Sequence, residues 1–305
     1  MEAVEAIFVS LGRWLSVEPR KPMVEPRWTE IYVNESEAAG MSADEALEGS
    51  HSVVTIADVA SIAECALLRQ AAIAAADRAA TDRRDGPSHD QQGLRHDGKE
   101  GRIRGKVVDL VGGDAQLLCD LILMRAAETI SERLPLLMPR LFGTGCLATS
   151  ILFNTKLSFS PGEPALNVYT HLPGGVNGGF NAHEDKQSLT LLVPLSTCRD
   201  SAGAVVDGDF DGGGTAFWTR RDSNARMERL NGEPTANIND VANSPQQDPK
   251  VVLQPPPGTA IVFGGDLTHA GQPVLGGQRC VLVASFSARE KMAGTDPGMS
   301  DSLAF

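Results

Sequence analysis

The sequence has little of what several common protein classes need. Its five cysteines are odd in number and widely spaced, with no C-x-x-C pair, so we expect neither a disulfide framework nor a zinc–thiolate site. No apolar run approaches the ~18 residues that a membrane-spanning helix requires. Acidic residues outnumber basic ones, 39 to 27, for a net charge of −12. This argues against nucleic acid as the main partner, because phosphate binding needs a basic surface.

Targeting signals and common catalytic motifs are also missing. The first twenty residues carry Glu2 and Glu5 where a secretory signal is basic, and their apolar stretch is short. With no signal and unpaired cysteines, we expect a cytoplasmic protein. We find no P-loop, G-x-S-x-G or H-E-x-x-H motif. The 305 residues, 42% of them apolar, are enough to bury a large core.

Composition and periodicity divide the chain into four segments. We expect an irregular N-terminal segment 1–54, a helical region 55–142 with a mobile loop at 83–106, a strand-rich domain 143–290 with an insertion at 219–257, and a tail 291–305.

Two helices are predicted in the second segment. Thr55 to Asp58 fits a capping box, and the Ala-rich stretch after it, to about residue 80, has a 3.6-residue apolar row through Val59, Ala63 and Leu67. Asp114 can cap a second helix, which prolines at 135 and 139 would end. Its apolar row is Leu118, Ile122, Ala126, Ile130 and Leu134. Both are interpreted as packing elements.

After residue 143 the apolar period changes from 3.6 to 2, which is typical of strands with one buried face. Short strands are predicted at 151–159, 166–171, 189–195, 215–218, 259–263 and 279–287. Many short strands separated by glycine and proline favour a sandwich or barrel over alternating βαβ units.

Two histidines stand in informative contexts. His183 and Asp185 precede the leucine-rich strand, and residues i and i+2 of an extended segment point to the same side. His269 follows the strand at 259–263 and could join them from a distant part of the chain. Two imidazoles and one carboxylate on one face of an octahedron form the triad that holds Fe(II) in non-haem oxygenases and leaves three positions open. We therefore predict His183, Asp185 and His269 as metal ligands and catalytic residues.

Arg279 begins the last predicted strand, ten residues after His269. An arginine returning to the pocket can hold a carboxylate with a two-pronged, charge-assisted hydrogen bond. By the period of 2 it shares a face with Val281 and Val283, an apolar wall that suits the methylene groups of 2-oxoglutarate.

These motifs resemble the Fe(II)- and 2-oxoglutarate-dependent dioxygenases, in particular their prolyl 4-hydroxylase-like branch. Tyr169 lies on the strand before the H-x-D pair, as a tyrosine does in that branch. The segment FDGGGTAF at 210–217 resembles its F-x-G-G-x-T-x-F element, and 257–279 is similar to its P-x-x-G-x-a-l-x-F and H-x-G-x-x-V-x-x-G-x-R run. The resemblance covers roughly 150–289. Arg279 stands where many collagen-type members have lysine, and the insertion 219–257 is longer than the usual connection.

The resemblance implies a fold and an activity. The fold would be α+β and mainly β, a double-stranded β-helix (jelly roll) with the N-terminal helices packed outside one sheet. The activity would be hydroxylation of a C–H bond with O2, Fe(II) and 2-oxoglutarate, which becomes succinate; ascorbate dependence is typical of the branch. Arg279 would bind the cosubstrate. Tyr169 is interpreted either as a second cosubstrate contact or as a core tyrosine.

The substrate is open at this point. Peptidyl proline follows from the resemblance, and a free amino acid or another small molecule is the alternative. Two other functions remain: a cupin-like zinc or manganese isomerase or hydrolase, which has no need of Arg279, and a non-catalytic binding module, for which a broken triad is expected.

Overall fold

The computed structural model describes residues 28–82, 95–97, 102–142, 157–171, 178–185, 187–199, 208–219 and 248–288. The helices are α2 (Glu35–Ala38), α3 (Ala43–Glu48), α4 (Ile62–Asp82), α5 (Val107–Arg133) and α6 (Leu137–Phe142). The strands before α6 are β1 (Trp28–Tyr32), β2 (Ser52–Ile56), β3 (Arg95–Asp97) and β4 (Arg102–Lys106). Those after it are β5 (Leu157–Phe159), β6 (Ala165–Thr170), β7 (Gly178–His183), β8 (Leu189–Pro194), β9 (Phe210–Gly212), β10 (Thr215–Phe217), β11 (Val251–Leu253), β12 (Ala260–Gly264) and β13 (His269–Ala288).

Antiparallel strands form two layers that share β13. The main sheet has the order β1-β2-β12-β8-β13-β6-β4-β3, with β5 also paired to β13. In the minor sheet the first half of β13 pairs with β7, β9 and β10, and β11 pairs with β10. From β6 onward the chain places β6, β8 and β12 in the main sheet and β7, β9 and β10 in the minor one. This alternation makes a double-stranded β-helix, so the predicted fold class is confirmed.

The strand β13 passes from one sheet to the other at Gly277. Phe210 of the minor sheet is paired with Gly277, and Thr170 of the main sheet is paired with the next residue, Gln278. Gly277 has φ +73°, and a Cβ there would collide with the carbonyl oxygen of Asp209. Only glycine adopts this conformation without strain. The chain therefore bends at Gly277 within one long strand, and the predicted strand 279–287 is the second half of β13, not a separate strand.

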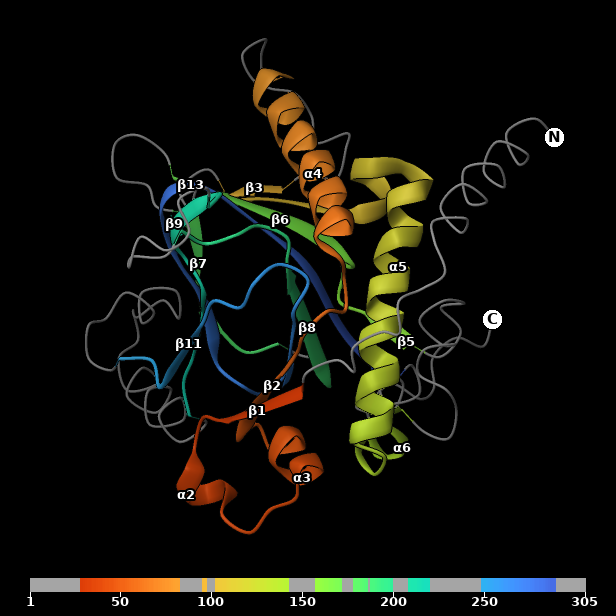
Figure 1. The fold of residues 1–305 in the computed structure, drawn as a ribbon, viewed down its shortest axis with the longest axis vertical. Coiled ribbons are helices and arrows are strands. Elements are labelled where there is room, and N and C mark those ends of the chain that lie inside the picture. Colours follow the sequence, from red (N-terminus) through yellow and green to blue (C-terminus); the bar gives the residue numbers. More distant parts are fainter. Residues whose placement is uncertain are drawn as a thin grey trace, which may run out of the picture.

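The helices α4 and α5 pack together against the outer face of the main sheet (Figure 1). The predicted row of the second helix is confirmed, since Ile122, Ala126, Ile130 and Leu134 are buried and Leu118 packs against them. The row predicted for the first helix is wrong. Leu67 is exposed, and the buried face of α4 is formed by Cys65, Leu68, Ala72, Ala75 and Ala76.

Both predicted helix starts are wrong as well. Thr55 lies within β2, and Asp58 has a positive φ of 63° that no helix start can use. Ser61 caps α4 instead, because its side chain accepts from the N–H of Glu64 while its own N–H donates to the Glu64 carboxylate. The second helix, α5, continues directly from β4 and begins at Val107, so Asp114 lies inside it.

Residues 28–54 are not irregular as predicted. The run Ser52–Ile56 forms β2, which pairs with both β1 and β12 and adds two strands to the main sheet. Val53, Val54 and Ile56 are buried on both faces, so the period-2 pattern of a half-exposed strand is absent. Residues 1–27 lie outside the described residues.

Two other segments expected to be loops contain strands. Within 83–106, β3 and β4 form a hairpin that extends the main sheet beyond β6; residues 83–94 and 98–101 lie outside the described residues. Within 219–257, β11 pairs with β10, and 220–247 lie outside them. Of the predicted strand 151–159, 157–159 form β5, and the rest is outside. Among the described helices none is long and apolar enough to cross a lipid bilayer.

Candidate active site

The two sheets enclose a cavity at one end of the β-helix. Its apolar lining includes Phe180, Leu192, Val281 and Val283, which belong to or pack against an apolar cluster between the two layers. Its polar lining comes mainly from the inward face of the main sheet, together with the end of β7 and the start of β13. Counting its open mouth, the cavity measures about 460 Å³.

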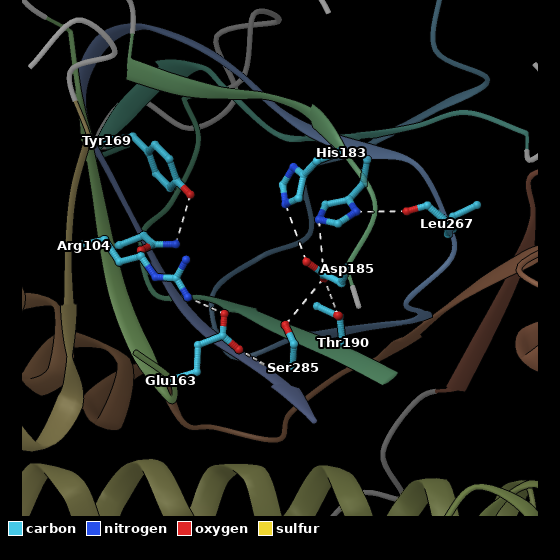
Figure 2. A network of polar contacts seen from close by, with 10 residues as sticks. Arg104, Glu163, Tyr169, His183, Asp185, Thr190, Leu267 and Ser285 are labelled. Carbon is cyan, nitrogen blue, oxygen red and sulfur yellow. Dashed lines mark hydrogen bonds and ion pairs between the residues drawn. The ribbon is translucent and has the colours of Figure 1, made fainter. Parts of the chain in front are cut away.

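The three predicted metal ligands meet at this cavity. His183 is the last residue of β7 and lies opposite His269, the first residue of β13, in the strand register. Asp185 follows two residues after His183 and points back between the imidazoles (Figure 2). One ligand atom from each of the three lies within 4.8 Å of the other two. Asp185 Oδ1 lies 3.6 Å from His183 Nε2, and Asp185 Oδ2 lies 3.7 Å from His269 Nε2.

These separations fit a shared ion. They are too long for hydrogen bonds. Two ligands that are each about 2.0–2.2 Å from one metal ion lie about 3–4 Å apart. Two imidazoles and one carboxylate are also a donor set that suits first-row transition metals. The residues present therefore fit the metal that the motifs predict.

The surroundings of His269 prepare it to be a ligand. Its ring is buried, and Nδ1 lies 3.0 Å from the carbonyl oxygen of Leu267. A carbonyl can only accept, so Nδ1 carries the proton and Nε2 presents its lone pair toward Asp185. Burial and the neighbouring His183 lower the pKa of His269 to about 4, although Asp185 opposes them. The imidazole is thus neutral at physiological pH.

Asp185 is held as an anion. Burial alone would raise its pKa, but contacts with His183, His269 and Thr190 outweigh burial and lower the pKa to about 2. The Thr190 hydroxyl donates to Oδ2 at 2.5 Å, and the Ser285 hydroxyl lies 3.5 Å from the same oxygen. These contacts fix the orientation of the carboxylate between the two histidines.

Arg279 lies near the bend of β13, at the other end of the cavity. Its side chain is buried, and Nη2 donates to the Thr215 hydroxyl at 3.0 Å. The guanidinium carbon lies 5.4 Å from the ring centre of Tyr169. Burial lowers the pKa of Arg279 from its ordinary value, yet a guanidinium remains charged in proteins. Among the described residues no carboxylate lies within ion-pair distance of it, so this end of the cavity offers a buried cation to an anionic ligand.

Tyr169 lies on the cavity wall beside Arg279. It is paired with Arg279 in the register of β6 and β13, and its hydroxyl accepts from Asn167 Nδ2 at 3.2 Å. The structure thus brings the five sequence-predicted residues to one cavity, with three at the metal-binding end and two at the cationic end.

The polar cavity residues that sequence reasoning missed include Arg104, Glu163, Asn167 and Ser285. Two of them could have been found from the period of 2. Ser285 lies on the same face of its strand as Arg279, and Asn167 lies on the same face as Tyr169. Arg104 carried no such signal, since it lies in a segment interpreted as a loop. Glu163 carried none, since it precedes its strand.

Comparisons with known proteins give distant matches. No protein-family model and no curated protein sequence matches the chain. Among solved structures it is similar to EvdO2 from Micromonospora carbonacea var. aurantiaca, with 18% identity, 80% of this chain and 89% of that one covered, and a TM-score of 0.45. A prolyl hydroxylase from Trichoplax adhaerens, solved with a hypoxia inducible factor peptide, matches with 12% identity, coverage of 86% and 94%, and a TM-score of 0.44.

A third match is SnoN, a non-heme alpha ketoglutarate dependent epimerase from nogalamycin biosynthesis, with 13% identity, coverage of 86% and 93%, and a TM-score of 0.43. At this distance the fold rests on the strand pairing of the chain itself, and the site rests on its own geometry. Both features that the motifs imply, the jelly-roll fold and the H-x-D…H arrangement, are present in the structure.

Proposed function

We propose that this chain is an Fe(II)- and 2-oxoglutarate-dependent dioxygenase that hydroxylates a C–H bond of a small substrate or a peptide. One observation carries the proposal: a cavity with a two-histidine, one-carboxylate triad at one end and, at the other, a buried arginine that has no carboxylate partner among the described residues. A metal site alone does not need that arginine. A dicarboxylate that chelates the metal through one end needs a cation for the carboxylate at its other end.

His183, Asp185 and His269 would hold the iron. When bound, iron together with 2-oxoglutarate supplies the oxidising power: substrate, O2 and 2-oxoglutarate become hydroxylated substrate, succinate and CO2. The protein binds and orients the reactants. Asp185 brings one negative charge, and the hydrogen bonds from Thr190 and to Leu267 keep the ligand side chains in position.

Arg279 and Thr215 would bind the distal carboxylate of 2-oxoglutarate, with Tyr169 beside them. Val281 and Val283 line the wall between that end and the triad, so the methylene groups of the cosubstrate would lie on an apolar surface. The buried environment strengthens the ion pair, because water does not compete for it.

Two substrate classes remain from the sequence, peptidyl proline and a free amino acid or another small molecule. The motif resemblance supports peptidyl proline and a dependence on ascorbate; the polar lining of the cavity beyond the triad and Arg279 supports a small molecule.

The test is succinate release from 2-oxoglutarate by the iron-loaded chain, over a panel of peptides and amino acids. We expect oxygen-dependent succinate formation that a substrate stimulates and that Asp185→Ala abolishes. Under anaerobic conditions, iron and 2-oxoglutarate should give a visible charge-transfer band. A chain that binds iron but forms neither the band nor succinate would instead be a cupin-like metal enzyme or a binding module.

A further inference from the structure

A second polar group lies in the cavity wall, apart from the triad and from Arg279. It consists of Arg104 on β4 and Glu163 just before β6, both labelled in Figure 2, together with Asn167 on β6. We call it the Arg104 cluster. The proposed chemistry of iron and 2-oxoglutarate uses none of these side chains.

The cluster is held by neighbouring strands of the main sheet. Arg104 and Asn167 are directly paired in the register of β4 and β6, which places their Cβ atoms about 5 Å apart on the same face. Arg104 Nη2 donates to Glu163 Oε1 at 2.5 Å, and the other oxygen of Glu163 accepts from the backbone N–H of Ser285. The Glu163 side chain is buried, so its carboxylate is fixed in place.

Two members of the cluster have hydrogen-bonding capacity that the described residues do not use. The Asn167 residue is only 4% exposed, and its Oδ1 atom has no hydrogen-bond partner. If the amide group is rotated by half a turn, Oδ1 faces the Tyr169 hydroxyl and Nδ2 is the atom without a described partner, because Tyr169 contacts only one side of the amide. Arg104 has five N–H donors, and Glu163 is its one described partner. A buried polar atom without a partner is costly, so Asn167 indicates a ligand, and the unused donors of Arg104 lie beside it on the same face of the sheet.

The position of the cluster points to the substrate, not to the cosubstrate. Ser285, which donates to Glu163, is six residues from Arg279 along β13, roughly 20 Å at the rise of a strand. The hydroxyl of Ser285 lies 3.5 Å from Asp185, so the cluster borders the metal-binding end. The Arg104 side chain is 28% exposed and that of His183 is 45% exposed. The guanidinium therefore reaches the open mouth, where a substrate would enter.

We propose that the Arg104 cluster binds the head group of a free α-amino acid, and that this is the substrate class of the enzyme. The carboxylate would take the unused N–H donors of Arg104, and the amino group would donate to Asn167 Oδ1 and Glu163. That the amino acid is hydroxylated rests on the proposed function, whereas its binding to the cluster does not. A proline inside a peptide has neither a carboxylate nor an N–H on its ring nitrogen, so it would leave both Arg104 and Asn167 unsatisfied.

The first experiment measures binding without catalysis. Isothermal titration calorimetry of the full chain with free L-amino acids, their C-terminal amides and their N-acetyl derivatives tests both contacts. We expect at least one free amino acid to bind and its amide to bind at least tenfold more weakly. Equal binding of the amide, or binding of prolyl peptides but no free amino acid, would overturn the proposal.

The second experiment uses variants of the cluster. Arg104→Gln should raise the dissociation constant and the KM for the amino acid at least tenfold, with the KM for 2-oxoglutarate within twofold of wild type. Arg140→Gln on α6, where Arg140 pairs with Glu48 at the surface, is the matched control and should change neither. A rise in the KM for 2-oxoglutarate instead would place the cosubstrate on Arg104 and overturn the proposal.

Arg104→Gln leaves Glu163 without its partner and can impair folding, so Asn167→Leu is the second variant. A leucine here removes the orphaned oxygen but also the hydrogen bond from Asn167 Nδ2 to the Tyr169 hydroxyl, so the two effects on the melting temperature oppose each other, while amino-acid binding should weaken. Unchanged amino-acid binding in a folded Asn167→Leu protein would contradict the assignment. If amino acids bind through the cluster but no succinate forms, the proposed function fails and the binding site stands.

Discussion

The two faces of the main sheet are built from the same strands and carry opposite chemistry. On β13, the residues that face the helices are apolar: Cys280, Leu282, Ala284 and Phe286. The residues that face the cavity alternate with them and include Arg279, Val281, Val283 and Ser285. The helix side has close-packed apolar groups, whereas the cavity side has a buried cation with no carboxylate within ion-pair distance among the described residues, and a buried amide oxygen without a described partner.

This difference indicates that the helix-facing side of the sheet stabilises the fold, whereas the cavity-facing side is suited to binding. An ion pair between α4 and α5, Glu64 with Arg125, has two hydrogen bonds of 3.0 Å and needs no ligand. The charged groups of the cavity have hydrogen-bonding capacity that the described residues do not use, so bound molecules would supply the partners. Substitutions on the two faces should therefore separate activity from stability.

The largest effect is expected at the triad. His269→Ala removes a ligand, so iron binding and succinate formation should fall by more than the 10–100-fold typical of residues that only support a ligand. Metal content by atomic absorption and succinate release are the measurements. His51→Ala is the control, since His51 contacts Glu37 away from the cavity, and it should leave both unchanged. Full activity in His269→Ala would exclude the triad.

Arg279→Ala should have the second largest effect on activity. Loss of a buried charge pair costs about 2–5 kcal/mol, so the affinity for 2-oxoglutarate should drop by one to several orders of magnitude, while iron affinity changes little. Arg279→Lys should restore part of it, without the two-pronged geometry. Titration of the anaerobic iron protein, followed by its charge-transfer band, checks this. An unchanged titration in Arg279→Ala would remove 2-oxoglutarate from the proposal.

On the opposite face, Leu282→Ala should reverse the pattern. Leu282 is fully buried against the helices, and such truncations lower the free energy of unfolding by about 2–5 kcal/mol. The KM for 2-oxoglutarate should stay at the wild-type value. Urea unfolding and steady-state kinetics on the same preparation measure both. A raised KM with unchanged stability would mean that the two faces are not separate.

The smallest effect is expected at the helix ion pair. Burial favours the neutral form of Glu64, but Arg125 and Ser61 outweigh it and lower its pKa below the ordinary value of 4.5. A lowered folded-state pKa stabilises the protein above the unfolded pKa and loses that stability as the pH falls through the folded pKa. Glu64→Gln should cost about 1 kcal/mol at pH 7, since the pair is partly solvated.

The pH dependence of that cost is the sharper measurement. Urea unfolding of wild type and Glu64→Gln at pH 7 and near pH 3 should show the gap between them shrinking in acid. A gap that is equal at both pH values would assign the effect of the substitution to packing and not to charge.

Some of this contrast was predictable from the residues alone. The period of 2 in 279–287 separates a cavity face from a core face, and His183 with Asp185 share a side for the same reason. The second helix showed its buried row because its apolar residues repeat every four positions. The start of the first helix was mistaken because two segments fit a capping box, and pairing of β2 with β12 decided between them.

Local pattern determined which residues carry chemistry: the H-x-D pair, the later histidine and the arginine ten residues on. Tertiary structure decided what they do together, because β13 must bend at Gly277 before His269 meets His183 and Arg279 meets Tyr169. It also decided the Arg104 cluster. Arg104 and Glu163 are 59 residues apart, and no periodicity of a strand or helix reaches across that distance; only sheet pairing brings them together.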